Sequence, residues 1–158
     1  MIDILQIIKE EHLLIKKQIK DMIESKNNTE KIKLFTQMQK LLSFHLKFEK
    51  EYLYQEAESY IKDLSSFITK SLDNHTQIDK ILSNISKYFK ELKTSNNSII
   101  KAIEQLEEEV FMPKMRTYMS TDDREDMGAT YLDLKTEFMG QVFGAKSKKI
   151  RTSHELAI

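Results

Sequence analysis

Apolar residues recur at steps of three and four along most of the chain, which is the spacing of one face of an α-helix. Residues that break helices are scarce, because the 158 residues include only three glycines and one proline. This leaves little turn chemistry for a sheet. We therefore expect an all-α protein, and the length fits one domain.

Polar turns divide the apolar pattern into five helices. We expect a turn at 25–29, a second within 55–63 and a third at 94–98. The expected helices cover residues 3–25, 30–56, about 63–92, 98–118 and 120–138. Pro113 should kink or loosen the last turns of the fourth helix, and Gly140 and Gly144 should end the fifth.

Long amphipathic helices joined by short turns predict an antiparallel up-down four-helix bundle, here with an additional C-terminal helix. We assign this bundle to residues 1–140. Residues 141–158 are rich in basic side chains and are expected to form a flexible tail.

The composition excludes several classes of function. The net charge is zero, so no strong field favours nucleic acid or a membrane surface. There is no cysteine, which excludes disulfides and thiolate metal sites and leaves His, Asp, Glu or Tyr to hold any metal. We see no secretory signal or membrane-spanning stretch and expect a cytoplasmic protein, either a monomer or a homodimer.

The second expected helix carries an ionisable pair within its apolar stripe. Phe35, Met38 and Leu42 lead at helical steps to His45, and Glu49 follows one turn later. The imidazole and the carboxylate should therefore point into the core. Burying such groups is costly unless something pairs with them, and a metal ion is one such partner.

Other helices place similar residues at a similar depth. His12 fills a gap in the stripe of the first helix, and His75 lies in the stripe of the third. A single histidine in an apolar stripe is more often a hydrogen-bonded core residue than a ligand. Three at matched depth on three helices favour a shared site, to which Glu107 of the fourth helix can contribute.

This combination of imidazoles and carboxylates suits iron or manganese, and zinc is also possible. If two ions bind, Glu49 and Glu107 are the natural bridges, since each carboxylate has two oxygens. Asp79 is expected to be exposed or to stand behind the ligands, and His154 to be a tail residue. Tyr52 and Tyr54 either hydrogen-bond a bound ligand or pack, and packing is favoured.

The order and spacing of these motifs resemble the hemerythrin-like, HHE-type cation-binding domains over roughly residues 1–138. The motifs that carry this resemblance are Glu11-His12, His45-x-x-x-Glu49, Asn74-His75, and Glu107-Glu108 followed by Phe111-Met112-Pro113. The chain departs from the family at one place. Ile103 stands four residues before Glu107, where the family has its last histidine.

Two registers of the fourth helix remain open. In the first, Ile103 leaves one metal position short of a ligand. In the second, a shift by one residue puts Glu104 and Glu108 in the two places. The candidate ligands are therefore His12, His45, Glu49, His75 and Glu107, with Glu104 and Glu108 as the alternative pair.

The resemblance implies a non-haem iron centre with one or two ions per chain, which binds or senses O2 or a related ligand such as NO or peroxide. Cluster-repair members of the family carry an extra cysteine-containing segment, so that role ranks lower here. The alternative is a degenerate bundle, without metal or with one ion, that acts as a structural or interaction module. Catalysis ranks lowest, because nothing in the sequence defines a pocket for an organic substrate.

Overall fold

The computed structural model describes residues 1–155, with side chains described as far as residue 140. Within that range the chain forms helices and short connections and no strand, which confirms the all-α expectation. None of the described helices is both long and apolar enough to cross a membrane.

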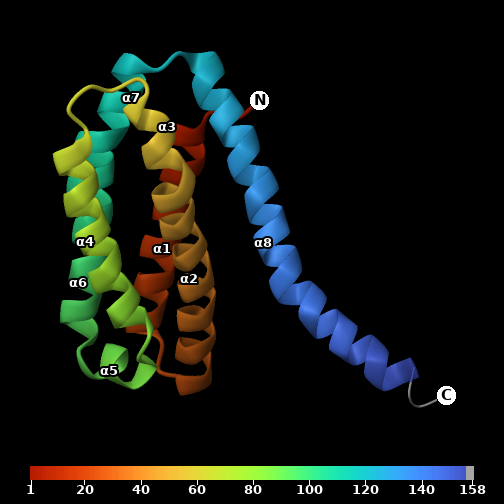
Figure 1. Cartoon of the computed structure of the whole chain (residues 1–158). Helices are drawn as coiled ribbons and strands as arrows, with labels where there is room; N and C mark the ends of the chain where they lie inside the picture. Colours follow the sequence, from red (N-terminus) through yellow and green to blue (C-terminus); the bar gives the residue numbers. More distant parts are fainter. Residues whose placement is uncertain (156–158) are drawn as a thin grey trace.

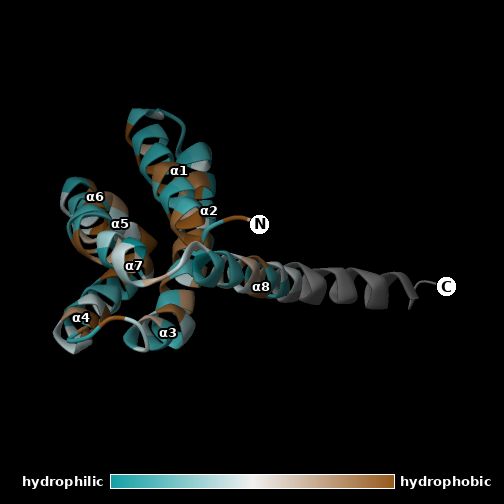
Figure 2. Cartoon of the chain, turned by 90° about the horizontal axis from the view of Figure 1, so that it is seen from above, coloured by the Kyte–Doolittle hydropathy of each residue, from teal (hydrophilic) through white to brown (hydrophobic). Residues whose placement is uncertain are grey.

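The helices run alternately up and down, as expected for the bundle (Figure 1). In chain order they are α1 (Ile4–Glu24), α2 (Asn28–Phe48), the π-helical segment η1 (Glu49–Leu53), α3 (Tyr54–Glu58), α4 (Ser65–Leu82), α5 (Ile85–Lys90), α6 (Leu92–Lys101), the π-helical segment η2 (Ala102–Phe111), α7 (Met112–Tyr118) and α8 (Thr121–Glu155). Seen from above, α1, α3, α4 and α6 are arranged around the centre of the bundle, and α8 extends to one side (Figure 2).

The connection between the third and fourth expected helices lies earlier than the sequence suggested. The side chain of Asn84 accepts a hydrogen bond from the Lys87 backbone N–H and caps α5, which separates α4 from α6. The turn expected at residues 94–98 is wrong, because these residues lie within α6. The Ser98 hydroxyl donates to the Thr94 carbonyl within the helix, which makes such a residue compatible with a helical position.

Two further expectations about helix ends need correction. Pro113 lies in the first turn of α7, where its missing N–H is tolerated, and the irregular stretch η2 precedes it rather than follows it. Helix α8 does not end at Gly140 or Gly144. The side chains of the basic tail and of His154 lie outside those described, and the domain boundary at residue 140 stays a prediction.

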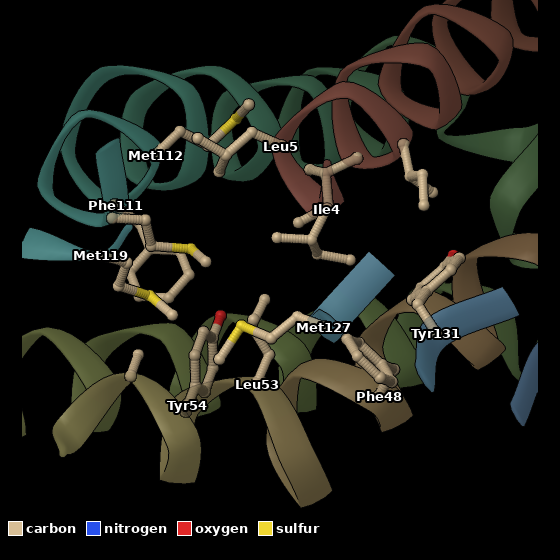
Figure 3. Packing of buried hydrophobic residues seen from close by; sticks show 14 of the residues in the cluster. Ile4, Leu5, Phe48, Leu53, Tyr54, Phe111, Met112, Met119, Met127 and Tyr131 are labelled. Atoms are coloured by element: carbon tan, nitrogen blue, oxygen red, sulfur yellow. The ribbon is translucent and has the colours of Figure 1, made fainter. Parts of the chain in front are cut away.

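The apolar core forms two clusters, one toward each end of the bundle. The upper cluster lies toward the top of the bundle as drawn in Figure 1 and includes Phe48, Phe111 and, from α8, Tyr131 (Figure 3). Ile8 of α1 also belongs to it. The lower cluster includes Ile15, Leu42, Ile78 and Ile103. Four long helical paths build the bundle, and they consist of α1, of α2 with η1 and α3, of α4, and of α6 with η2 and α7. Along each path the chain passes from one cluster to the other through a short polar interval.

Helix α8 is held against the start of α1 by a close backbone approach. The Arg124 Nε donates to Asp3 Oδ2 at 2.8 Å, and Asp3 is the N-cap of α1. One turn further along α8, an added Cβ on Gly128 would lie 2.0 Å from the Ile2 carbonyl oxygen. Only glycine fits there without a shift of the N-terminal segment.

The glycines of α8 supply a matched test of this contact. We expect Gly128→Ala to lower the free energy of unfolding by about 1–3 kcal/mol, because the added methyl group overpacks the contact with Ile2. Gly140→Ala meets nothing within 4 Å and should be neutral or stabilising by up to about 1 kcal/mol, since alanine favours the helix. Chemical denaturation of both variants measures this, and equal effects would contradict the close approach.

Candidate metal centre

A layer of ionisable side chains separates the two apolar clusters. All five are buried, with exposed fractions of 7% or less, and they come from every long path of the bundle: His12 from α1, His45 from α2, Glu49 from η1, His75 from α4 and Glu107 from η2. Each is flanked along its own path by core residues of both clusters. The packing that buries the clusters therefore also positions the layer.

The first set of possible ligands consists of His12, His45 and Glu107. The Nε2 atom of His12 lies 2.5 Å from Glu107 Oε2, and the Nε2 atom of His45 lies 3.3 Å from the same oxygen. The two imidazole Nε2 atoms are 3.4 Å apart. Two ring nitrogens and one carboxylate oxygen therefore converge on one point in the core.

The second set consists of Glu49, His75 and, again, Glu107. The His75 Nε2 lies 3.1 Å from Glu49 Oε2, and the other oxygen of Glu49 lies 3.1 Å from His45 Nε2. In each set the ligand atoms lie within 4.8 Å of one another. Because Glu107 belongs to both, the two sets share one carboxylate, as expected for neighbouring ions with a bridge.

Both carboxylates of the layer stand in π-helical segments. The Tyr54 backbone N–H donates to the carbonyl of Glu49, and the Met112 N–H donates to that of Glu107, so each bond spans five residues. This spacing also brings side chains five apart onto one face. The Tyr54 hydroxyl consequently lies 3.3 Å from Glu49 Oε2 and 3.3 Å from His75 Nε2.

A second ring of carboxylates holds the outer nitrogens of two imidazoles. The Nδ1 of His45 donates to Glu11 Oε2 at 3.0 Å, and the Nδ1 of His12 donates to Glu108 Oε1 at 3.0 Å. Such contacts fix the orientation of an imidazole and leave its Nε2 for an ion. The Nδ1 of His75 is buried and has no hydrogen-bond partner among the described residues.

The structure places the alternative residues of the fourth helix outside both sets. Glu104 pairs with Lys16 at 2.9 Å, and its side chain is 46% exposed. Glu108 stands behind His12, at its Nδ1, and belongs to neither set. Ile103 is buried in the lower cluster and lines a small cavity with His75 and Glu107. The register with Glu107 inward is therefore the one that the chain adopts. Asp79 is exposed.

The charges of the layer shift its pKa values in opposite directions. Burial alone would lower the pKa of His45, but the carboxylates of Glu49, Glu107 and Glu11 outweigh it and raise the pKa well above its ordinary value. Burial alone would raise the pKa of Glu49, yet His45 and His75 hold it well below its usual range. Without an ion, these shifts favour the cationic form of His45 and the anionic form of Glu49.

The pKa values of two further groups follow the same balance. Burial opposes the charged form of Glu11, but hydrogen bonds and charge from His45, Lys135 and Tyr131 lower its pKa. Burial and the charges of Glu49 and Glu107 raise the pKa of the Tyr54 hydroxyl, which therefore keeps its proton in the absence of metal.

Sequence reasoning underrated Tyr54 and missed the roles of Glu11, Tyr131 and Lys135. Tyr54 stands five residues after Glu49, and that spacing leaves the face of a regular α-helix. Glu11 was noted only as part of the motif Glu11-His12. The contacts from α8 depend on tertiary packing, and Tyr131 reads as an apolar-stripe residue. The five-residue interval after the His-x-x-x-Glu motif is the one signal that could have pointed to Tyr54.

Comparison with models of known protein families identifies the family of this fold and site. The family model described as the hemerythrin HHE cation-binding domain matches residues 3–112, which include all five residues of the layer. No curated protein and no solved structure matches the chain.

The opposed pKa shifts predict how the stability of the metal-free protein depends on pH. Protonated His45 contributes stability that is full below its unfolded pKa of 6.5 and is lost as the pH rises through its higher folded pKa. Ionised Glu49 contributes stability above its unfolded pKa of 4.5, and this is lost on acidification. The melting temperature of metal-stripped protein should therefore be highest at about pH 5–6.

The His45→Gln variant serves as the control for this profile. It should lack the alkaline decline that is due to His45, because glutamine does not titrate. A wild-type melting temperature that rises steadily from about pH 6 to about pH 9 would contradict a raised pKa at His45.

Proposed function

Because the chain belongs to the hemerythrin HHE cation-binding domain family, we propose that it is a non-haem iron protein. The buried layer would hold one or two ions and bind or sense O2 or a related small ligand such as NO or peroxide. The family implies a bound metal, and the two sets of His and Glu side chains could hold one. The observation that carries the proposal is that both sets share Glu107.

The hydrogen-bonding capacity of the layer supports the binding of a metal cation. The Nε2 atom of His45 faces Glu49, Glu107 and His12 at 3.1, 3.3 and 3.4 Å. This nitrogen carries one proton at most, so a single N–H cannot satisfy three polar atoms. A metal ion accepts lone pairs from all of them at once. Imidazole and carboxylate are ligands that iron shares with manganese and zinc, and the residues present fit such an ion.

The two positions are unequal. The set with His12 and His45 has two imidazoles, and both rings are oriented by outer carboxylates. The other set has one imidazole, His75, and Ile103 occupies the place of the family's last histidine. We expect the first position to bind an ion more tightly than the second.

The space beside the second set supports a very small ligand. A cavity of about 10 Å³ lies there, lined by Tyr54, Ser71, His75, Ile103 and Glu107 among others. That volume is about the minimum for one water molecule, so a diatomic ligand would need a small shift of the lining side chains, and an organic substrate is excluded. Ferrous iron would supply open coordination positions and electrons for such ligands. Tyr54 would keep its hydroxyl proton and could donate it in a hydrogen bond to a ligand in this cavity.

Metal content is the direct test. Protein purified without chelator should contain about one or two iron ions per chain, measured by elemental analysis and an optical spectrum. Anaerobic ferrous iron at about 100 times its Kd should stabilise stripped protein by about 2.7 kcal/mol. His45→Ala should remove an ion, whereas the similarly buried Leu41→Ala should lower stability and keep the metal content. Absence of metal, together with no stabilisation by ferrous iron, would instead favour the structural-module alternative.

Residue 103 offers a gain-of-function test. Ile103→His places an imidazole four residues before Glu107, at the second set, and should raise the iron content per chain or the affinity for the second ion. Ile103→Leu keeps an apolar side chain of the same volume and should leave both unchanged. No increase in the histidine variant would contradict the view that Ile103 makes the second position weak.

A further inference from the structure

Helix α8 lies outside the residues that match the family model, yet two of its side chains contact a carboxylate that stands directly behind the polar layer. The Tyr131 hydroxyl donates to Glu11 Oε2, and the Lys135 Nζ lies 2.7 Å from Glu11 Oε1. Glu11 is the carboxylate that accepts the Nδ1–H of His45. A path of direct contacts therefore runs from α8 through Glu11 to a candidate ligand.

Glu11 is a buried carboxylate fixed by donors on both of its oxygens. One oxygen accepts from His45 and Tyr131, and the other accepts from Lys135. Two of the three donors come from α8. Without them, Glu11 would retain one partner in an apolar setting, and its carboxylate could rotate away from the imidazole or draw in water.

Close packing fixes the position of α8 next to Glu11. The ring of Tyr131 is fully buried and packs edge-on against Phe48 with ring centroids 4.7 Å apart (Figure 3). It also packs edge-on against Phe44 at 5.2 Å. The close approach at Gly128 lies one turn earlier in α8. The packing of its buried ring therefore places the Tyr131 hydroxyl beside Glu11.

We propose that α8 is part of the metal centre, with Tyr131 and Lys135 as positioning residues that hold His45 through Glu11. The inference rests on the proposed function, because it requires an ion at His45. Partners behind a ligating imidazole typically affect metal affinity by about 10- to 100-fold, since they fix the ring and its tautomer. Here those partners depend on a helix that the family model does not include.

The same contacts make the coupling reciprocal. If docked α8 raises the metal affinity by some factor, then bound metal raises the docking equilibrium of α8 by the same factor. Loss of metal would therefore loosen α8, and displacement of α8 would weaken the binding of the ion. Occupancy of a buried site would in this way be transmitted to a helix at the outside of the bundle.

Four single variants separate positioning from simple stability. Tyr131→Phe and Lys135→Met remove the two donors, and each should weaken the binding of ferrous iron at the tighter position by about tenfold or more. Lys135→Arg keeps a cation and should restore most of the affinity. Tyr88→Phe is the matched control, because Tyr88 is buried in the lower cluster and its hydroxyl donates to Asn96, away from the polar layer. It should lower stability and leave the affinity unchanged.

Hydrogen exchange of the α8 backbone supplies a readout that a purely structural role would not move. In the wild type and in Tyr88→Phe, ferrous iron should slow amide exchange in residues 121–140. In Tyr131→Phe and Lys135→Met this protection should shrink. Unchanged affinity in both donor variants, with undiminished protection of α8, would overturn the proposal and leave the proposed function intact. A wild type that binds no metal would overturn both.

Discussion

The structure depends on burying a layer of ionisable groups between two apolar clusters. Imidazoles and carboxylates taken out of water are tolerated only if they neutralise and hydrogen-bond one another or hold an ion. Here the first option is met in part, through the charged pair of His45 and Glu49. An ion would satisfy the polar atoms of the layer that these side chains cannot satisfy among themselves. Every long path of the bundle must therefore reach the layer in register, because each contributes at least one of its five members.

The two halves of the chain build this layer in corresponding but unequal ways. Glu11-His12 and His45 in the first half correspond to Asn74-His75 and Ile103 in the second. In the second half, the Nδ1 of His75 has no outer carboxylate among the described residues, and Ile103 supplies no imidazole. The result is one set of candidate ligands in which both imidazoles have an outer carboxylate, beside a second set whose single imidazole has none, next to a cavity that admits only a very small molecule.

Much of the site follows from pattern alone. The apolar stripes place His12, His45 and His75 at one depth, and the bundle topology then brings them together. The remainder depends on features that periodicity does not carry. Tyr54 is brought to Glu49 by a π-helical turn, so its spacing does not match the helical repeat that reveals the other residues. The contacts of α8 with Glu11 arise from tertiary packing between residues more than a hundred positions apart.

Local polarity predicts a turn at residues 94–98, where the structure has a helix. Residues 94–98 are rich in Ser, Thr and Asn, yet they lie within α6, where the Ser98 hydroxyl donates to the Thr94 carbonyl one turn earlier. The separation of helices comes instead from a single cap at Asn84. A side chain that can hydrogen-bond its own backbone is compatible with either outcome, and only the surrounding packing decides between them.

The two π-helical segments imply that the site depends on the number of residues in these segments as much as on the types of residue. A π-helical turn accommodates about one residue more than an α-helical turn. Deleting one residue from Glu49–Leu53 would rotate everything that follows by about 100° and present a different side chain to His75 in place of Tyr54. Two related chains could thus share every ligand and still differ in the group beside the ions through a change of one residue in length.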